Sequence, residues 1–282
     1  LWLLKYLPNM LACHVTIIHG ARGPSNTITC GTSSGLLAVG EAARTIARGA
    51  ADVAIAGGAE SKLNPVGLLR QALLGRLIDG EEPEPAAACR PFDRDHHGTV
   101  IGEGGALLIL EDHERAVARE ARIYAEFAGF GAACEPSGVD YLTPSAGGVA
   151  RATTSALADA DLAPESVDLL VSQAVGVPGE DAAEAEQVRR CLGERAADVP
   201  VVAPAGAYGD LFAGAGAVNL AMAAKVLHEQ KLPATANFAS PAEGCELNVR
   251  MAGGSAEVAA AACAGYSIGG QSGAIILKRY EP

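Results

Sequence analysis

Aromatic residues, basic residues and paired cysteines are scarce in this 282-residue sequence. Phe, Trp and Tyr make up 4% of the chain, so its core must be built from Ala, Val, Leu and Ile. Lys and Arg number 21 against 33 Asp and Glu, and the net charge of −12 argues against a nucleic-acid partner. No apolar run reaches membrane-spanning length. The seven scattered cysteines form no Cys-x-x-Cys pair, which favours buried thiols in a reducing cytoplasm.

Hydrophobic residues make up 49% of the chain, and helical and strand patterns alternate along it, which is typical of a layered α/β fold. Helices are predicted at 35–48, after Asn64, and at 112–119, 149–157, 181–191 and 214–227. Strands are predicted at 14–18, 27–30, 53–56, 123–127, 168–171, 200–203 and 274–278, with a hairpin around 102–105. Two halves of similar order suggest an internal duplication. We place the junction at 132–144 and expect domains at 1–131 and 132–282.

Five segments carry a combined motif signal. They are GPSNTITCGTSSGLLAVGEA (23–42), ADVAIAGGAES (51–61), CRPFD (89–93), GEGGALLILE (102–111) and AGAGAVNLA (213–221). Their order and spacing resemble those of β-ketoacyl synthases, the ketosynthases of the thiolase superfamily. The resemblance implies a thiolase-like fold with two duplicated α/β halves in αβαβα layers. The chain starts inside the family's pattern, so part of the first half is expected to be missing or to be supplied by another chain.

The family's nucleophile is a cysteine at the N-terminus of a buried helix, where the helix dipole and free amides favour the thiolate. Aligned without gaps from Gly23 or back from Gly40, that position holds Thr32. A threonine hydroxyl is a poor nucleophile without an adjacent base. Cys30 stands two residues earlier and is the alternative nucleophile, because on a strand it would face the same side as Thr32. A buried structural thiol is the simpler interpretation of Cys30.

The resemblance also locates two catalytic histidines, a supporting lysine and a gating phenylalanine, and all four are replaced. The first histidine corresponds to Gln173, the lysine to Ala205 and the second histidine to Asp210. Glutamine cannot carry a positive charge, and an ionised aspartate repels the enolate that the histidines stabilise. The gate motif, usually Gly-Phe-Gly-Gly, is here Ser267, Ile268, Gly269 and Gly270. The glycine scaffold is retained while the chemical positions are lost.

Other polar motifs favour structural roles. Neighbouring His96 and His97 have side chains that diverge, and no Cys, Asp or Glu cluster shows zinc spacing, so no metal is predicted. The Gly-Glu-Gly-Gly segment at 102–105 precedes no helix, which argues against a dinucleotide cofactor. Glu103 is therefore predicted to be a buried structural carboxylate. Arg90 and Asp93 are predicted to fix their loop by charge-assisted hydrogen bonds.

Three functional hypotheses follow. The first is a cytoplasmic, non-catalytic subunit similar to the chain-length factors of type II polyketide synthesis. Such a subunit would pair with an active ketosynthase along residues 24–30 and shape the acyl tunnel, and its partner would receive the acyl carrier protein. The second is a divergent condensing enzyme or acyltransferase that uses Cys30. The third is a structural homodimer that binds acyl chains.

Overall fold

The computed structural model describes residues 7–78, 80, 84–135 and 147–281. The helices are α1 (Met10–His19), α2 (Ser34–Ala47), α3 (Pro65–Leu73), α4 (His113–Ala118), α5 (Gly147–Asp159), α6 (Pro178–Leu192), α7 (Ala205–Tyr208) and α8 (Ala215–Glu229). Short 3₁₀ turns are η2 (Gly31–Ser33), η3 (Pro85–Ala87), η4 (Pro164–Ser166), η5 (Gly193–Ala197) and η6 (Phe212–Gly214). The strands are β1 (Val53–Ser61), β2 (Glu103–Glu111), β3 (Glu126–Cys134), β4 (Leu169–Val171), β5 (Val201–Val202), β6 (Lys231–Leu232), β7 (Gly254–Ser255), β8 (Ala260–Tyr266) and β9 (Gln271–Lys278).

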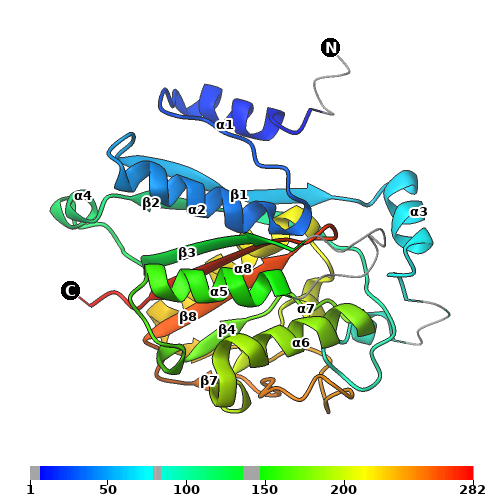
Figure 1. Ribbon diagram of the computed structural model, residues 1–282. Coiled ribbons are helices and arrows are strands. Elements are labelled where there is room, and N and C mark those ends of the chain that lie inside the picture. Colours follow the sequence, from blue (N-terminus) through cyan, green and yellow to red (C-terminus); the bar gives the residue numbers. More distant parts are fainter. Residues whose placement is uncertain (1–6, 79, 81–83, 136–146, 282) are drawn as a thin grey trace.

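A five-stranded sheet in the order β3-β9-β8-β4-β5 forms the centre of the molecule (Figure 1). Strands β8, β4 and β5 are parallel, and β9 runs antiparallel to both β8 and β3. Helices α5 and α6 cover one face, and α8 and α2 pack between the other face and the β1–β2 pair. The layers therefore alternate helix, sheet, helix, sheet, as the sequence pattern predicts.

Small and β-branched residues build this core because the chain has few aromatic side chains to fill it. Strand β8 (Ala260–Tyr266) is buried along its whole length, and β9 is buried except at its two ends. A strand covered on both faces carries a continuous apolar run without polar alternation. The absence of alternation explains why the sequence analysis did not identify β8.

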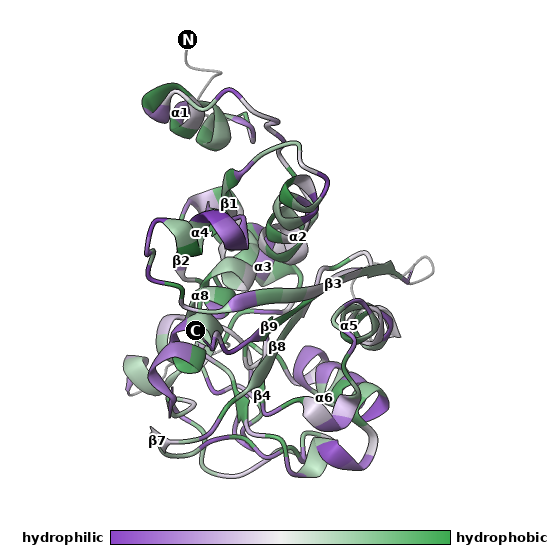
Figure 2. Cartoon of the chain, turned by 90° about the vertical axis from the view of Figure 1, so that its left-hand side faces the viewer, coloured by the Kyte–Doolittle hydropathy of each residue, from purple (hydrophilic) through white to green (hydrophobic). Residues whose placement is uncertain are grey.

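The β1–β2 pair is an antiparallel ribbon without further strands among the described residues. Ala56 and Leu108 face the core, whereas Ile55, Leu107 and Ile109 on the opposite face are 38%, 52% and 63% exposed. Helix α1 stands apart over that face and buries none of its residues (Figure 2). No described helix is both long and apolar enough to cross a membrane.

Most predicted helices are confirmed to within a few residues. Asn64 caps α3, because its Oδ1 accepts from the amide of Gly67 at 2.9 Å. The strand predicted at 14–18 is wrong: the segment lies within α1, which ends at Gly20 in the left-handed conformation (φ 62°). The strand predicted at 27–30 is also wrong, because these residues have no regular hydrogen-bonding partner in the described chain.

The hairpin predicted around 102–105 is wrong as well. Gly104 and Gly105 lie at the start of β2, which pairs with β1, and the close approach of the two backbones explains Gly105, because its Cβ would lie 2.2 Å from the carbonyl oxygen of Gly58. Glu103 is exposed rather than buried and accepts from the Ser61 hydroxyl at 2.7 Å. Strand β3 extends to Cys134 and pairs with β9, and the expected junction at 132–144 lies largely outside the described residues. The division into domains at 131/132 stays a prediction.

Candidate active site

The N-terminus of α2 forms a tight elbow that positions Thr32. Gly31 begins η2 with φ at 56°, and Thr32 is half-buried in that turn, one residue before the helix cap. Ser34 ties the elbow together, because its hydroxyl accepts from the amide of Cys30 at 2.8 Å and donates to the carbonyl of Gly31 at 2.6 Å. The elbow places Thr32 near the positive end of the helix dipole. Nothing among the described residues acts as a hydrogen-bonding base for its hydroxyl.

Cys30 lies immediately before this turn and is half-buried. It caps η2 with φ at −127°, so it stands at the helix entrance rather than on a strand. Its backbone amide and carbonyl are both hydrogen-bonded, to Ser34 and Ser267 respectively. No histidine of the described chain forms a hydrogen bond with its thiol.

Gln173 lies just beyond the end of β4, and both ends of its side-chain amide are bonded to backbone. Its Nε2 donates to the carbonyl of Tyr266 at 2.8 Å, and its Oε1 accepts from the amide of the same residue at 3.0 Å. Gln173 is 7% exposed. This pair of bonds joins the end of β4 to the end of β8 and uses one of the two Nε2 protons.

Asp210 is held in a buried ion cluster. The guanidinium of Arg76 contacts Glu180 at 2.6 and 2.9 Å and Asp210 at 3.0 Å, and it also donates to Gln71 at 2.7 Å. Asp210 is 1% exposed, and its other oxygen accepts from the amide of Phe212 at 2.8 Å. Burial raises the pKa of Asp210, with Arg76 opposing the shift. Burial by itself lowers the pKa of Arg76, but the ion pairs with Glu180 and Asp210 raise this pKa by more than burial lowers it. The guanidinium therefore stays charged.

Ala205, which is predicted to stand at the position of the family's lysine, begins α7 in an apolar cluster with Cys89 and Val175. Because β4 and β5 are parallel, the segments that follow them, with Gln173 and Ala205, lie at the same end of the sheet. A buried carboxylate, Glu184, accepts from the amide of Gln173 at 3.0 Å, and its Oε2 has no partner in the described structure. Burial raises the pKa of Glu184 to about 7.

Asp181, next to Glu180 in the first turn of α6, organises the neighbouring loop. Its carboxylate accepts from the backbone amides of Phe92, Val175 and Gly176 and lies 3.2 Å from Nδ1 of His96. His96 is thus a buried structural partner rather than a surface residue, as its side chain is 8% exposed. Asp93 fixes the adjacent loop as predicted, because it accepts from the amides at 239 and 240. The described residues contain no cluster of metal-ligating side chains.

The gate turn, defined as residues 267–270, lies against the elbow. The amide of Ser33 donates to Oγ of Ser267 at 2.9 Å. Ile268 is 37% exposed, and Gly269 and Gly270 have φ of 103° and 88°, which favour glycine. The 3₁₀ turn after Asp210, η6, also packs against η2. The predicted site positions therefore gather around the start of α2 and the strand ends beside it, while their roles stay predictions.

Sequence reasoning missed the importance of Arg76, Glu180 and Glu184. Acidic residues at 180, 181 and 184 share one side of α6, and that spacing was the available signal. Arg76, the counter-ion of Glu180, lies 104 residues away from it in the sequence, and no local pattern connects the two. Ser33, the residue at the N-cap position of α2, directs its hydroxyl to the gate turn and makes no capping bond.

Both halves of the chain match one known family. Residues 2–116 match the family described as "Beta-ketoacyl synthase, N-terminal domain", and residues 124–239 match "Beta-ketoacyl synthase, C-terminal domain". The 3-oxoacyl-[acyl-carrier-protein] synthase 2 of Vibrio cholerae is 33% identical over 96% of this chain and 66% of its own length. A putative polyketide beta-ketoacyl synthase 1 of Streptomyces halstedii is 34% identical over 96% of this chain and 64% of its own length. The chain thus spans about two thirds of the length of these relatives.

Solved structures give the same result. A type II polyketide ketosynthase, in complex with its acyl-carrier protein and bound to the hexaketide, has a TM-score of 0.92 at 28% identity, covering 97% of this chain and 67% of that one. The ishigamide ketosynthase/chain length factor has a TM-score of 0.88 at 26% identity, covering 98% and 66%. These similarities confirm the thiolase-like α/β fold. Since two domains of one family match in order along it, the chain belongs to the β-ketoacyl synthase family.

Proposed function

We propose that this chain is a non-catalytic ketosynthase-type subunit of fatty acid or type II polyketide synthesis. It pairs with an active β-ketoacyl-acyl-carrier-protein synthase and forms part of the wall of the acyl tunnel. The observation that carries the proposal is the occupation of the polar atoms at the two histidine positions. Gln173 is bonded at both ends to the backbone of Tyr266, and Asp210 is bonded to Arg76 and Phe212. An ionised Asp210 has no proton to donate to a developing enolate, and Gln173 has one Nε2 proton engaged by Tyr266 and carries no positive charge.

The electrostatics of the site also oppose malonyl chemistry. A malonyl thioester brings a carboxylate, and its decarboxylation develops negative charge on the thioester oxygen. Arg76 is already paired with two carboxylates, and Ala205 provides no cation where the family has lysine. A buried site with unbalanced acidic groups raises the energy of an added anion. The hydroxyl of Thr32 has no adjacent base, so it is a poor nucleophile, and the site keeps the family's fold without its reactive groups.

Pairing with another subunit is supported by the segment that precedes the elbow. Residues 24–30 are exposed or half-buried, and they make no strand ladder within the described chain. Backbone that lies outside any strand ladder can pair with a second chain. With a net charge of −12, this subunit repels an acidic carrier protein, and the active partner is the one that receives it.

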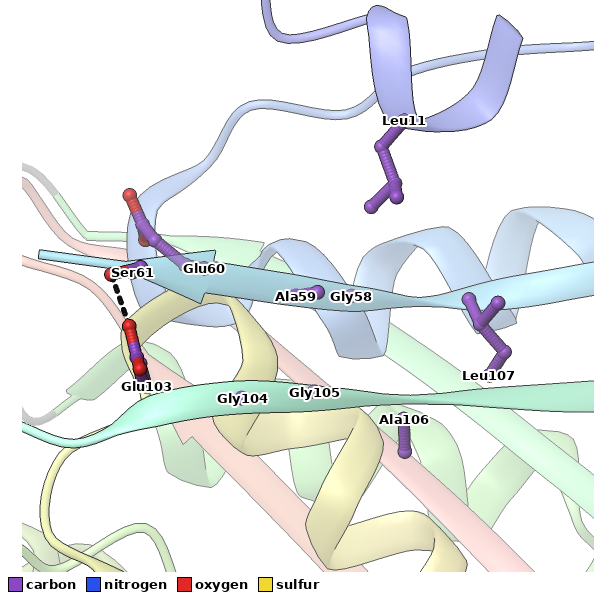
Figure 3. Close-up of a pocket in the computed structure, with 10 residues that line it drawn as sticks. All are labelled: Leu11, Gly58, Ala59, Glu60, Ser61, Glu103, Gly104, Gly105, Ala106 and Leu107. Carbon is purple, nitrogen blue, oxygen red and sulfur yellow. Dashed lines mark hydrogen bonds between the residues drawn. The ribbon is translucent and has the colours of Figure 1, made fainter. Parts of the chain in front are cut away.

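The proposal includes additional polypeptide, in this or another chain, that completes the β1–β2 ribbon. In the second half, the β8–β9 pair is flanked by β4 on one edge and β3 on the other, and β1–β2 has neither neighbour among the described residues. The outer face of β1–β2 is apolar, with Ile55, Leu107 and Ile109 exposed. A shallow groove runs between this face and α1, from which Leu11 points toward the strands (Figure 3). The face of a sheet that is exposed to water usually carries polar side chains. We therefore expect the apolar outer face of β1–β2 to be covered.

Co-expression tests the pairing. The tagged chain is produced together with a ketosynthase of the intact Cys-His-His type encoded beside it, and alone as a control. We expect the two proteins to co-purify, and we expect the chain alone to release no carbon dioxide from malonyl-acyl-carrier protein. Decarboxylation by the isolated chain would contradict the proposal. Self-association without binding of the ketosynthase would instead support an acyl-binding homodimer.

Cys30 offers a second candidate function, that of a divergent acyltransferase. Its half-buried place at the entrance to η2, two residues before the predicted nucleophile position at Thr32, favours it. Incubation with an acyl thioester or a cerulenin-like electrophile, followed by peptide mapping, distinguishes the two functions. Exposed Cys134 provides the internal measure of non-specific labelling. Labelling of Cys30 above that level would favour the acyltransferase, and equal or lower labelling, with a reactive control ketosynthase, would exclude it.

A further inference from the structure

The gate turn is bound to the elbow through the hydroxyl of Ser267. Its Oγ accepts from the backbone amide of Ser33 at 2.9 Å and lies 2.8 Å from the Ser33 hydroxyl. It also donates to the carbonyl of Cys30. The Ser33 hydroxyl in turn donates to the carbonyl of Gln271 at 2.8 Å. One buried side chain thus connects β8 and its following turn to both ends of η2, across 234 residues of sequence.

The proton assignment follows from the types of partner. A carbonyl oxygen only accepts, so Ser267 must use its single proton on Cys30. It then accepts from the Ser33 amide and from the Ser33 hydroxyl, whose own proton is shared with the carbonyl of Gln271. Ser33 is fully buried and Ser267 is 3% exposed, so water does not replace these bonds. Removal of the Ser267 hydroxyl would therefore take an acceptor from the buried amide of Ser33 and a donor from the half-buried carbonyl of Cys30.

The local backbone is shaped to allow this contact. A Cβ at Gly31 would lie 3.0 Å from Oγ of Ser267, so the glycine at 31 leaves the hydroxyl its space. A Cβ at Gly270 would lie 1.8 Å from the carbonyl oxygen of Glu135, which holds the other end of the turn against the chain. Ser267 stands where the family's gate motif usually begins with glycine, a residue without a hydroxyl.

We propose that Ser267 is a positioning residue that locks the gate turn onto the elbow and holds Ile268 in one place. The inference deepens the proposed function, since a tunnel wall that sets acyl length must be fixed rather than mobile. The hydrogen bonds of Ser267 make the gate turn, which contains two glycines of positive φ, a rigid part of the site. The side chain of Ile268, 37% exposed, is the part that this clamp presents to an acyl chain or to the partner subunit.

Amide hydrogen exchange on the full 282-residue chain tests the clamp, with Ser267→Ala as the main variant. We expect peptides covering 30–34 and 267–271 to exchange at least tenfold faster than in the wild type, because the Ser33 amide loses its acceptor. The matched control is Ser272→Ala. Ser272 is 1% exposed, lies near the same turn, and its hydroxyl has no partner in the described structure, so these peptides should change less than about twofold.

Unchanged exchange in Ser267→Ala would overturn the clamp, and so would equal acceleration in Ser272→Ala, which would indicate general loosening. If Ser267→Ala does not fold, Ser33→Ala decides the question. That variant keeps the amide bond but loses the hydroxyl bridge, so it should accelerate exchange in the same two peptides, and an unchanged pattern would again overturn the proposal. In a complex with an active synthase, Ser267→Gly should also broaden the lengths of the acyl products. The exchange measurement needs no partner, so failure of the pairing proposal leaves its result intact.

Discussion

Replacement of Arg76 by methionine probes the buried ion cluster directly. Arg76 is 7% exposed and binds Glu180 through two nitrogens and Asp210 through one. Methionine keeps much of the volume but leaves two buried carboxylates without a counter-ion. Removal of one partner from a buried ion pair costs about 3–5 kcal/mol of unfolding free energy. For a chain of this size, such a loss lowers the melting temperature by roughly 10 °C.

The pH dependence gives this prediction its specificity. In the variant, Asp210 loses the cation that opposes the burial-driven rise in its pKa, so its folded pKa moves further above its unfolded value. The folded state then binds a proton that the unfolded state does not, and stability increases as the pH falls toward 5. The difference between variant and wild type should therefore be smaller at pH 5 than at pH 8. Asp210→Asn in the same background should recover part of the loss.

Urea denaturation at the two pH values measures both effects. The control is Arg115→Met, which removes an exposed pair with Asp52, in which the two side chains are 58% and 68% exposed. That change should cost less than about 1 kcal/mol. Two results would refute the idea that Arg76 neutralises the carboxylate of Asp210. One is a loss of unfolding free energy in Arg76→Met that is no larger than the loss in Arg115→Met, and the other is a loss that does not depend on pH.

Three further outcomes are expected. Thr32→Cys alone should produce no malonyl decarboxylation in a carbon dioxide release assay, because the histidine and lysine positions remain replaced; measurable turnover would show that the catalytic positions are misassigned. The pKa of Glu184 is raised to about 7 in the folded chain. The stability of the wild type should therefore fall by up to about 3 kcal/mol as the pH rises from about 4.5 to 7. In Glu184→Gln, this part of the plot of unfolding free energy against pH should be flatter. Gly131→Ala should destabilise the chain by about 1–3 kcal/mol in thermal unfolding, because its Cβ would lie 1.9 Å from the carbonyl oxygen of Ala152. Gly179→Ala, with open space around its Cβ, should leave the melting temperature nearly unchanged.

Local patterns in the sequence identified much of the fold. The apolar spacing from Gly35 predicted α2, and Asn64 with Pro65 predicted the start of α3, because helix periodicity and capping depend on residues a few positions apart. Local patterns led to wrong or missing predictions where the tertiary packing of a segment differs from what its own residues favour. The apolar run at 14–18 resembles a strand but lies in α1, and β8 has no alternation because both of its faces are buried.

The sequence by itself predicted which residues occupy the positions of the family's catalytic groups, since motif resemblance assigns them to Thr32, Gln173 and Asp210 without coordinates. Only the tertiary structure decided what these residues do. The amide of Gln173 is used by Tyr266, 93 residues away, and the carboxylate of Asp210 by Arg76, 134 residues away. A hydrogen bond depends on distance in space, and the chain brings such partners together only when the layers pack. The motifs therefore predict that the reactive groups are replaced, and the packing shows that Gln173 and Asp210 connect distant segments of the fold.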